Sequence, residues 1–130
     1  MIKSVVVEDN SEFRAFLKAL LLDRFPDGVV AEANDAHEAL RLVADIKPDI
    51  VLVDIGLPGG MNGLALTRRI RENGRHPPVV IITNYVLPEY KLEALRLGAD
   101  GFLPKQGSTA QDILSLIERL TMRGSPQREQ

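Results

Sequence analysis

The chain has 130 residues, which is the usual length of one domain and too short for two ordinary ones. Its 16 basic and 18 acidic residues give a formal net charge of −2, which disfavours nucleic-acid binding through bulk charge. The absence of cysteine excludes disulfide frameworks, thiolate metal sites and cysteine nucleophiles, and no apolar stretch approaches the ~20 residues that span a bilayer.

Short apolar runs alternate five times with segments of helical periodicity. Runs rich in β-branched residues and bounded by polar ones are typical of strands buried on both faces of a sheet. We expect such strands at residues 2–7, 29–33, 50–53, 79–82 and 101–103. After each run, apolar residues recur at the spacing of one helix face, so we also expect five helices.

Capping residues mark where several of these helices begin and end. The residue before the first turn of a helix often has a side chain that accepts a hydrogen bond from a free backbone amide. Proline is common in the first turn of a helix, and glycine is common just after the last turn. For the first, second and last helices we expect caps at Asn10 or Ser11, Asn34 or Asp35, and Ser108 or Thr109. Pro88 and Gly98 bound the fourth helix. The alternation implies an α/β fold, an open parallel sheet with helices on both faces.

Polar side chains stand at the ends of four expected strands. They are Glu8 and Asp9, Asp54, Thr83 and Lys105. In open α/β sheets, ligands bind beyond the carboxyl ends of the strands, so we expect these side chains to converge. Converging carboxylates repel one another unless a cation lies between them, and hard oxygen ligands suit Mg²⁺. With phosphate charge neutralised by Mg²⁺ and Lys105, Asp54 could form an aspartyl-phosphate.

The chain resembles the receiver domains of two-component response regulators over residues 1–120. Four motifs carry the resemblance in the order of the family: VVVED, VLVD followed by LP, IIT, and GADGFLPK, which begin at residues 5, 51, 81 and 98. The resemblance implies a flavodoxin-like five-stranded parallel sheet of order 2-1-3-4-5 with five helices. It implies a receiver domain at residues 1–122, which leaves residues 123–130 as a polar tail or truncated linker. The N-terminus has no signal-peptide pattern, so we expect a cytoplasmic protein.

The resemblance also implies a phosphoacceptor switch rather than an enzyme with an external substrate. Asp54 would take a phosphoryl group from the phosphohistidine of a sensor histidine kinase or phosphotransfer protein. Asp9, Asp54 and the backbone carbonyl of Gly56 would ligate Mg²⁺, and Glu8 would act through a metal-bound water. Lys105 would contact the phosphoryl oxygens.

Thr83 would also contact the phosphoryl group, and Phe102 stands at the aromatic switch position of the family. The alternative is that Phe102 is permanent core. The fourth helix, fifth strand and fifth helix would form the surface that changes, and this change would control a partner or an attached output domain. The same surface would also be the site of homodimerisation. Neither nucleic acid nor a membrane is expected to bind this domain. In the family, the positions of Gly56 and Tyr85 tune how fast the aspartyl-phosphate hydrolyses.

Three features depart from the family pattern. Gly63 follows Asp54 by nine residues instead of eight, and we expect the glycine pair at residues 59–60 to absorb the extra residue. Asn84 stands where a small residue is usual, and its amide would narrow access to the phosphoryl group. Gln106 replaces the usual proline after the lysine, so a cis bond there is not expected.

Two other functions use the same residues. A phosphatase of the haloacid-dehalogenase type would need a second aspartate two residues after the nucleophile, where Gly56 stands. An inert pseudo-receiver would only bind partners. A cluster of arginines could suggest nucleic-acid binding, but it lacks interleaved aromatics and is better interpreted as a solvated helix face. The cluster comprises Arg68, Arg69, Arg71 and Arg75.

Overall fold

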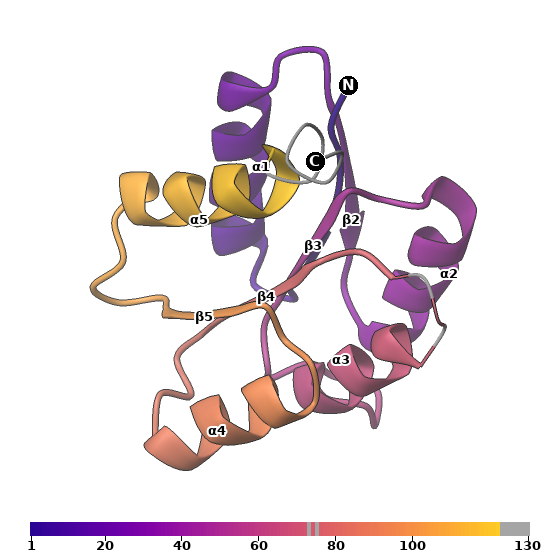
Figure 1. Ribbon diagram of the computed structural model, residues 1–130, viewed down its shortest axis with the longest axis vertical. Helices are drawn as coiled ribbons and strands as arrows, with labels where there is room; N and C mark the ends of the chain where they lie inside the picture. The colour runs from indigo at the N-terminus through magenta and orange to yellow at the C-terminus, as the bar shows by residue number, and fades with distance from the viewer. Residues whose placement is uncertain (73, 75, 123–130) are drawn as a thin grey trace, which may run out of the picture.

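The computed structural model describes residues 1–72, 74 and 76–122. The expected polar tail at residues 123–130 and Arg75 lie outside the described residues. Five strands alternate with five helices (Figure 1). They are β1 (Lys3–Val7), α1 (Ser11–Arg24), β2 (Val29–Ala33), α2 (Ala36–Ile46), β3 (Ile50–Val53), α3 (Gly63–Arg71), β4 (Val79–Thr83), α4 (Pro88–Arg96), β5 (Gly101–Pro104) and α5 (Ala110–Met122).

The strands form one parallel sheet of order β2-β1-β3-β4-β5, which confirms the predicted topology. In register, Val7 lies beside Val53, Val53 beside Ile81, and Ile81 beside Phe102. The three central strands therefore end at nearly the same level. Whatever follows β1, β3 and β4 in the sequence is delivered to one edge of the sheet.

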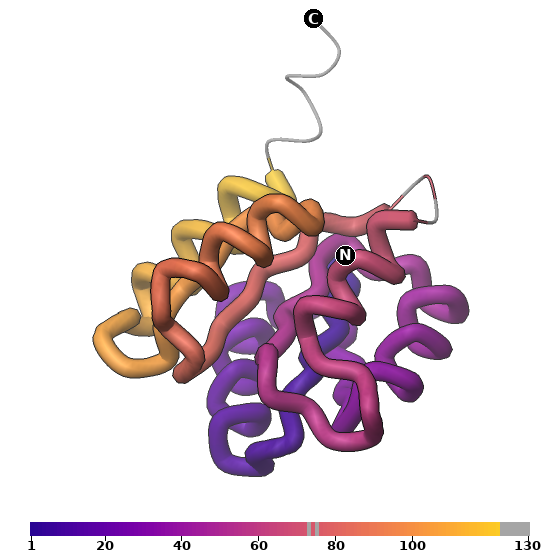
Figure 2. The backbone as a smooth tube through the Cα atoms, turned by 90° about the horizontal axis from the view of Figure 1, so that it is seen from below, coloured from indigo at the N-terminus to yellow at the C-terminus, as the bar shows by residue number. Residues whose placement is uncertain are grey.

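Two separate apolar cores lie on opposite faces of the sheet, because alternate residues of a strand point to opposite sides. One core packs β-strand residues such as Val53 and Ile81 against α2, α3 and α4. The other packs Leu52 and Ile82 against α1 and α5. Figure 1 shows these two layers of helices, and Figure 2 shows α2, α3 and α4 side by side across their face.

Local capping chemistry decides the helix starts that the sequence left open. Asn10 caps α1 by accepting a hydrogen bond from the Phe13 amide, and Asp35 caps α2 in the same way from the Glu38 amide. At α5, the Thr109 hydroxyl accepts from the Asp112 amide, and Asp112 accepts from the Thr109 amide in return. This reciprocal pair satisfies two amides that would otherwise lack a partner.

Three strand ends differ from the predicted ones, and one of them is the end of β4, which includes Thr83. β1 begins at Lys3 rather than at residue 2, and β5 continues through Pro104. Proline lacks an amide hydrogen, yet β5 is an edge strand, where one side of the backbone needs no partner. The Lys105 amide restores the ladder by donating to the Thr83 carbonyl at 2.9 Å. Within the described part of the chain, no helix is long and apolar enough to cross a membrane.

Candidate phosphoacceptor site

Three carboxylates converge at the carboxyl edge of the sheet, as predicted. Glu8 and Asp9 follow β1, and Asp54 follows β3. One carboxylate oxygen from each lies within 4.8 Å of the other two. Hydrogen bonds tie both strand ends into the sheet, since the Glu8 amide donates to the Ala33 carbonyl and the Asp54 amide to the Val7 carbonyl. Burial differs across the cluster, because Glu8 and Asp54 are buried while Asp9 is exposed.

Lys105 supplies the positive charge of this cluster. Its Nζ lies 2.9 Å from Glu8 Oε1 and 3.3 Å from Asp54 Oδ2. All three side chains are withdrawn from solvent, with exposed fractions of 13% for Lys105, 2% for Glu8 and 9% for Asp54. The peptide bond after Lys105 is trans, as expected for a bond before glutamine. The ammonium thus bridges two carboxylates that would otherwise repel each other in a poorly solvated place.

The pKa values of Glu8 and Lys105 reflect this burial and pairing. Burial raises the pKa of the Glu8 carboxyl, and hydrogen bonds from Lys105 and from the Asn10 amide lower it only in part. Burial alone would lower the pKa of the Lys105 ammonium, but the bond to Glu8 and the charge of Asp54 outweigh that effect and raise it. Lys105 is therefore firmly protonated at neutral pH.

Asp54 Oδ1 is buried and has no hydrogen-bond partner among the described residues. A buried polar atom without a partner costs free energy, so it marks a place where a ligand or water would be stabilised. The donor set around it is made of carboxylate oxygens, which suits a hard cation such as Mg²⁺. The chemistry of the cluster therefore fits the predicted metal.

Gly56 lies beneath the ring of Tyr85, in the loop that follows Asp54. A Cβ atom at Gly56 would lie 2.8 Å from Tyr85 Cε2, so the ring rests directly on this stretch of backbone. Tyr85 also meets Tyr90 of α4 edge-on, with ring centroids 5.7 Å apart. The two positions expected to tune hydrolysis are thus in contact with each other.

Thr83 is fully buried at the end of β4, and its hydroxyl accepts a hydrogen bond from the Tyr85 amide at 3.2 Å. Asn84 is exposed and, with Val86, Pro104 and Gln106, lines a groove of about 440 Å³. The groove connects the loops after β4 and β5. Asn84 therefore faces an open surface next to the strand ends.

Phe102 is half-buried and packs against the core beneath α2, α3 and α4. Tyr90 of α4 packs against the same core. In β4, Ile81 belongs to this core and Ile82 to the opposite one. Since side chains alternate along a strand, Thr83 shares a face of the sheet with Ile81 and Phe102.

The loop between Asp54 and α3 turns at the glycine pair that was expected to absorb the extra residue. Gly59 and Gly60 both have positive φ, at 90° and 89°, a region that other residues seldom occupy. The Gly63 amide donates to the Ile55 carbonyl at 2.8 Å and begins α3 against the end of β3.

Sequence reasoning missed two side chains of α1 that border the cluster. The centroid of the Phe13 ring lies 4.7 Å from Lys105 Nζ in a cation–π contact. Arg14 donates hydrogen bonds to the Glu8 carbonyl and to Glu32. One signal for the second contact was present: Glu32 interrupts an otherwise apolar strand, and a charge in such a strand requires a partner.

Comparison with known proteins places this site in a family. Residues 5–118 match the family model described as the response regulator receiver domain. The oxygen regulatory protein NreC of Staphylococcus haemolyticus is 32% identical over 114 residues. That match covers 88% of this chain and 52% of NreC, so the chain spans about half the length of this relative.

Solved structures agree with this match. A LuxR-family two-component response regulator from Aurantimonas sp. SI85-9A1 is 32% identical with a TM-score of 0.83, over 98% of this chain and 91% of that one. The BeF₃-activated N-terminal receiver domain of Klebsiella pneumoniae RstA is 31% identical with a TM-score of 0.80. The match covers 93% of this chain and 98% of that one. The chain belongs to the response regulator receiver domain family of two-component signalling systems.

Proposed function

We propose that the chain is a phosphoacceptor switch in which Asp54 receives a phosphoryl group from a phosphohistidine. The donor would be a sensor histidine kinase or a phosphotransfer protein in the cytoplasm. Receiver domains are signalling switches rather than turnover enzymes, and the acidic cluster is of the kind that is phosphorylated in them. The observation that carries the proposal is the unpartnered, buried Oδ1 of Asp54 beside two further carboxylates.

Asp9, Asp54 and the backbone carbonyl of Gly56 are the groups that would ligate Mg²⁺ directly. When bound, Mg²⁺ would neutralise charge on the phosphoryl oxygens. Glu8 already accepts hydrogen bonds from Lys105 and from the Asn10 amide, so both of its carboxylate oxygens are engaged by the protein itself. Its role would therefore be to hold a metal-bound water rather than the ion itself.

In the proposed transfer, an Asp54 carboxylate oxygen forms the new O–P bond as the P–N bond to the donor histidine breaks. The electron pair of the broken bond goes to the imidazole nitrogen of the donor. Lys105, which already contacts Asp54 Oδ2, would pair with a phosphoryl oxygen and offset its charge. The Thr83 hydroxyl now accepts a hydrogen bond from the Tyr85 amide. In the phosphorylated protein it would instead donate a hydrogen bond to a phosphoryl oxygen.

The output would be a changed surface over α4, β5 and α5. Thr83 and Phe102 share one face of the sheet, and Tyr90 of α4 packs against the same core as Phe102. The loop before α4 and its outer side also carry exposed apolar residues, including Leu92 at 68% and Leu95 at 45% exposure. We propose that a second copy of the chain covers this surface once Asp54 is phosphorylated, because apolar patches of this kind mark interaction sites.

Phosphorylation is tested with Mg²⁺ and a small phosphodonor such as acetyl phosphate. We expect a mass increase of one phosphoryl group on the wild type and none on Asp54→Asn. Asp45→Asn is the matched control, since Asp45 is exposed on α2, away from the cluster. Labelling that persists in Asp54→Asn would refute the proposal, and so would a wild type that binds no Mg²⁺ at Asp9 and Asp54, as an inert pseudo-receiver would.

Homodimerisation is tested by sedimentation with and without beryllofluoride, a mimic of the phosphoryl group. We expect the sedimentation coefficient to rise with the mimic in the wild type and to stay at the monomer value in Leu92→Glu. Leu92 is exposed, so the substitution should leave the fold intact. A monomer under both conditions would remove the dimer from the proposal and leave phosphorylation untouched.

A further inference from the structure

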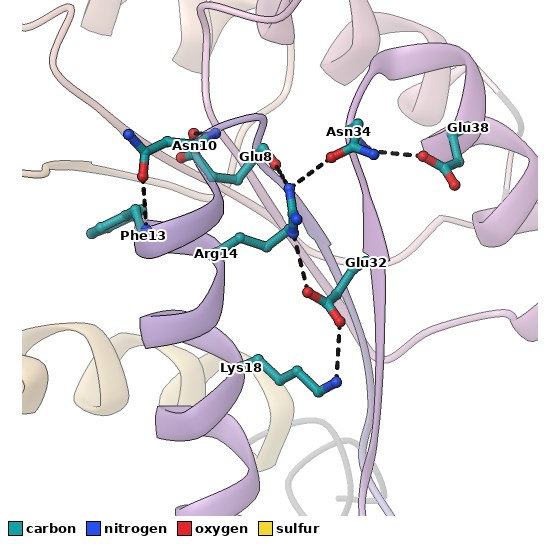
Figure 3. A network of polar contacts seen from close by, with 8 residues as sticks. All are labelled: Glu8, Asn10, Phe13, Arg14, Lys18, Glu32, Asn34 and Glu38. Atoms are coloured by element: carbon teal, nitrogen blue, oxygen red, sulfur yellow. Dashed lines mark hydrogen bonds and ion pairs between the residues drawn. The ribbon is translucent and has the colours of Figure 1, made fainter.

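Arg14 joins three elements beside the acidic cluster (Figure 3). Its Nη1 donates to the Glu8 carbonyl at 2.8 Å and to Asn34 Oδ1 at 2.6 Å. Its Nε donates to Glu32 Oε1 at 3.1 Å. The guanidinium thus ties α1 to the end of β1, to β2 and to the residue that follows β2. Its side chain is only 19% exposed, so these bonds form in a partly desolvated place.

The bond to the Glu8 carbonyl acts on the backbone that carries Asp9. That carbonyl belongs to the peptide unit between Glu8 and Asp9, and its direction sets where the Asp9 side chain starts. On the other side of Glu8, the amide donates to the Ala33 carbonyl at 3.0 Å. The backbone is therefore held before and after the Glu8 Cα atom, by β2 on one side and by Arg14 on the other.

The orientation of Asp9 depends on this backbone, because no other contact with a described residue orients its side chain. Its side chain is exposed, and its carboxylate has no hydrogen-bond partner in the part of the chain that the structure describes. The Glu8 carboxylate, by contrast, is fixed by Lys105 and by the Asn10 amide. A ligand group that is ordered before binding loses less entropy when the ligand arrives.

We propose that Arg14 is a positioning residue for the divalent cation. It holds the Glu8–Asp9 peptide so that the Asp9 carboxylate faces Asp54. The inference rests on the proposed function, in which these carboxylates hold Mg²⁺. The nearest negative charge to Arg14 is Glu32, which also accepts a hydrogen bond from Lys18 at 3.1 Å. Glu32 offsets the guanidinium charge, so Arg14 can hold the peptide without strongly repelling a cation.

The direction in which Mg²⁺ affinity changes when Arg14 is substituted distinguishes a positioning role from an effect of its charge alone. Removing a positive charge near a cation site would tighten cation binding through Coulomb's law. Removing a residue that orients a ligand would weaken it, by about 10-fold or more for groups that orient metal ligands. A weaker Mg²⁺ affinity in Arg14→Ala would therefore be opposite to the electrostatic expectation.

The experiment is a Mg²⁺ titration of the full chain followed by backbone amide chemical shifts. We expect Arg14→Ala to raise the dissociation constant about 10-fold. Lys18→Ala is the matched control, because it removes a positive charge and a bond to Glu32 from the same helix but leaves the Glu8 carbonyl bonded. Lys18→Ala should change the Mg²⁺ dissociation constant only slightly, and any change should be toward tighter binding.

A second readout uses the metal-free protein. The amide order parameter of Asp9 should fall in Arg14→Ala and stay at the wild-type value in Lys18→Ala. If Arg14→Ala fails to fold, Arg14→Met keeps the apolar stem and carries the same expectations. An unchanged or tighter Mg²⁺ constant in either variant would overturn the inference. A wild type that binds no Mg²⁺ at Asp9 and Asp54 would instead overturn the proposed function.

Discussion

Gly63 begins α3 directly against the carbonyl group of Asp54. A Cβ atom at Gly63 would lie 2.1 Å from the Asp54 carbonyl oxygen and 2.8 Å from the carbonyl carbon. Both contacts are with backbone, which cannot swing aside as the tip of a side chain can. The first turn of α3 and Asp54, the proposed phosphoacceptor, are therefore packed against each other at a distance that only glycine permits.

Gly63→Ala should destabilise the protein, because the new methyl group would push α3 away from the end of β3. Overpacking of this kind costs about 1–3 kcal/mol of the free energy of unfolding. Urea denaturation measures it. Gly101→Ala is the control, since its methyl group would meet the flexible end of Leu116 instead of backbone, at 2.7 Å. Equal losses in the two variants would contradict this account.

Lys105→Met should cost more stability than any exposed lysine substitution. It leaves the buried Glu8 and Asp54 carboxylates without their bridging cation, and breaking a buried ion pair costs about 3–5 kcal/mol. Mg²⁺ should restore part of the loss, by offering a second cation to the same oxygens. Thermal unfolding with and without Mg²⁺ measures both effects. Lys91→Met, at an exposed position of α4, should stay within about 0.5 kcal/mol of the wild type.

Tyr85→Ala should shorten the lifetime of the proposed aspartyl-phosphate. The ring rests on Gly56, two residues after Asp54, and its removal would open that side of the site to water. Loss of the phosphoryl label over time measures the rate. Val86→Ala, at the next and equally exposed position of the loop, should leave the rate unchanged. A longer lifetime in Tyr85→Ala would show that the ring does not shield the phosphoryl group.

Glu32→Gln should alter how stability depends on pH. The hydrogen bond from Lys18, together with that from Arg14, lowers the pKa of the Glu32 carboxyl below its usual 4.5. The stabilisation from Glu32 is therefore complete above pH 4.5 and is lost as the pH falls through the lowered value. The wild type should exceed Glu32→Gln by no more than about 1 kcal/mol at neutral pH, because the carboxyl is one-third exposed. A difference that grows as the pH falls below 4.5 would contradict this sign.

The convergence of Asp54 with Glu8 and Lys105 could be predicted because it depends on topology alone. Hydrophobic periodicity locates the strands, and parallel strands deliver the residues after them to one edge of the sheet. The positive φ angles of Gly59 and Gly60 could also be expected, because a pair of glycines in a loop supplies the backbone freedom that such a turn needs.

The contacts of Arg14 and Phe13 could not be predicted in the same way. Whether an α1 side chain reaches the Glu8 carbonyl or the Lys105 ammonium depends on the rotation of the helix about its axis and on side-chain rotamers. The spacing of apolar residues along α1 shows which face of the helix is buried, but it fixes neither the exact rotation of the helix nor the side-chain rotamers. The choice of Asn10 over Ser11 as the cap of α1 likewise depended on which oxygen faces the Phe13 amide.

The two faces of the sheet carry different parts of the proposed function. Lys105 lies over the Phe13 ring of α1, on the side where Leu103 packs, whereas Phe102 packs under α2, α3 and α4. Charge chemistry thus adjoins one helical layer, and the residues expected to move adjoin the other. β4 ends at Thr83, which is proposed to contact the phosphoryl group and which lies on the same face of the sheet as Phe102. Under the proposed function, β4 would connect the charged side of the sheet with the side on which Phe102 packs, so a substitution that loosens β4 would uncouple the two.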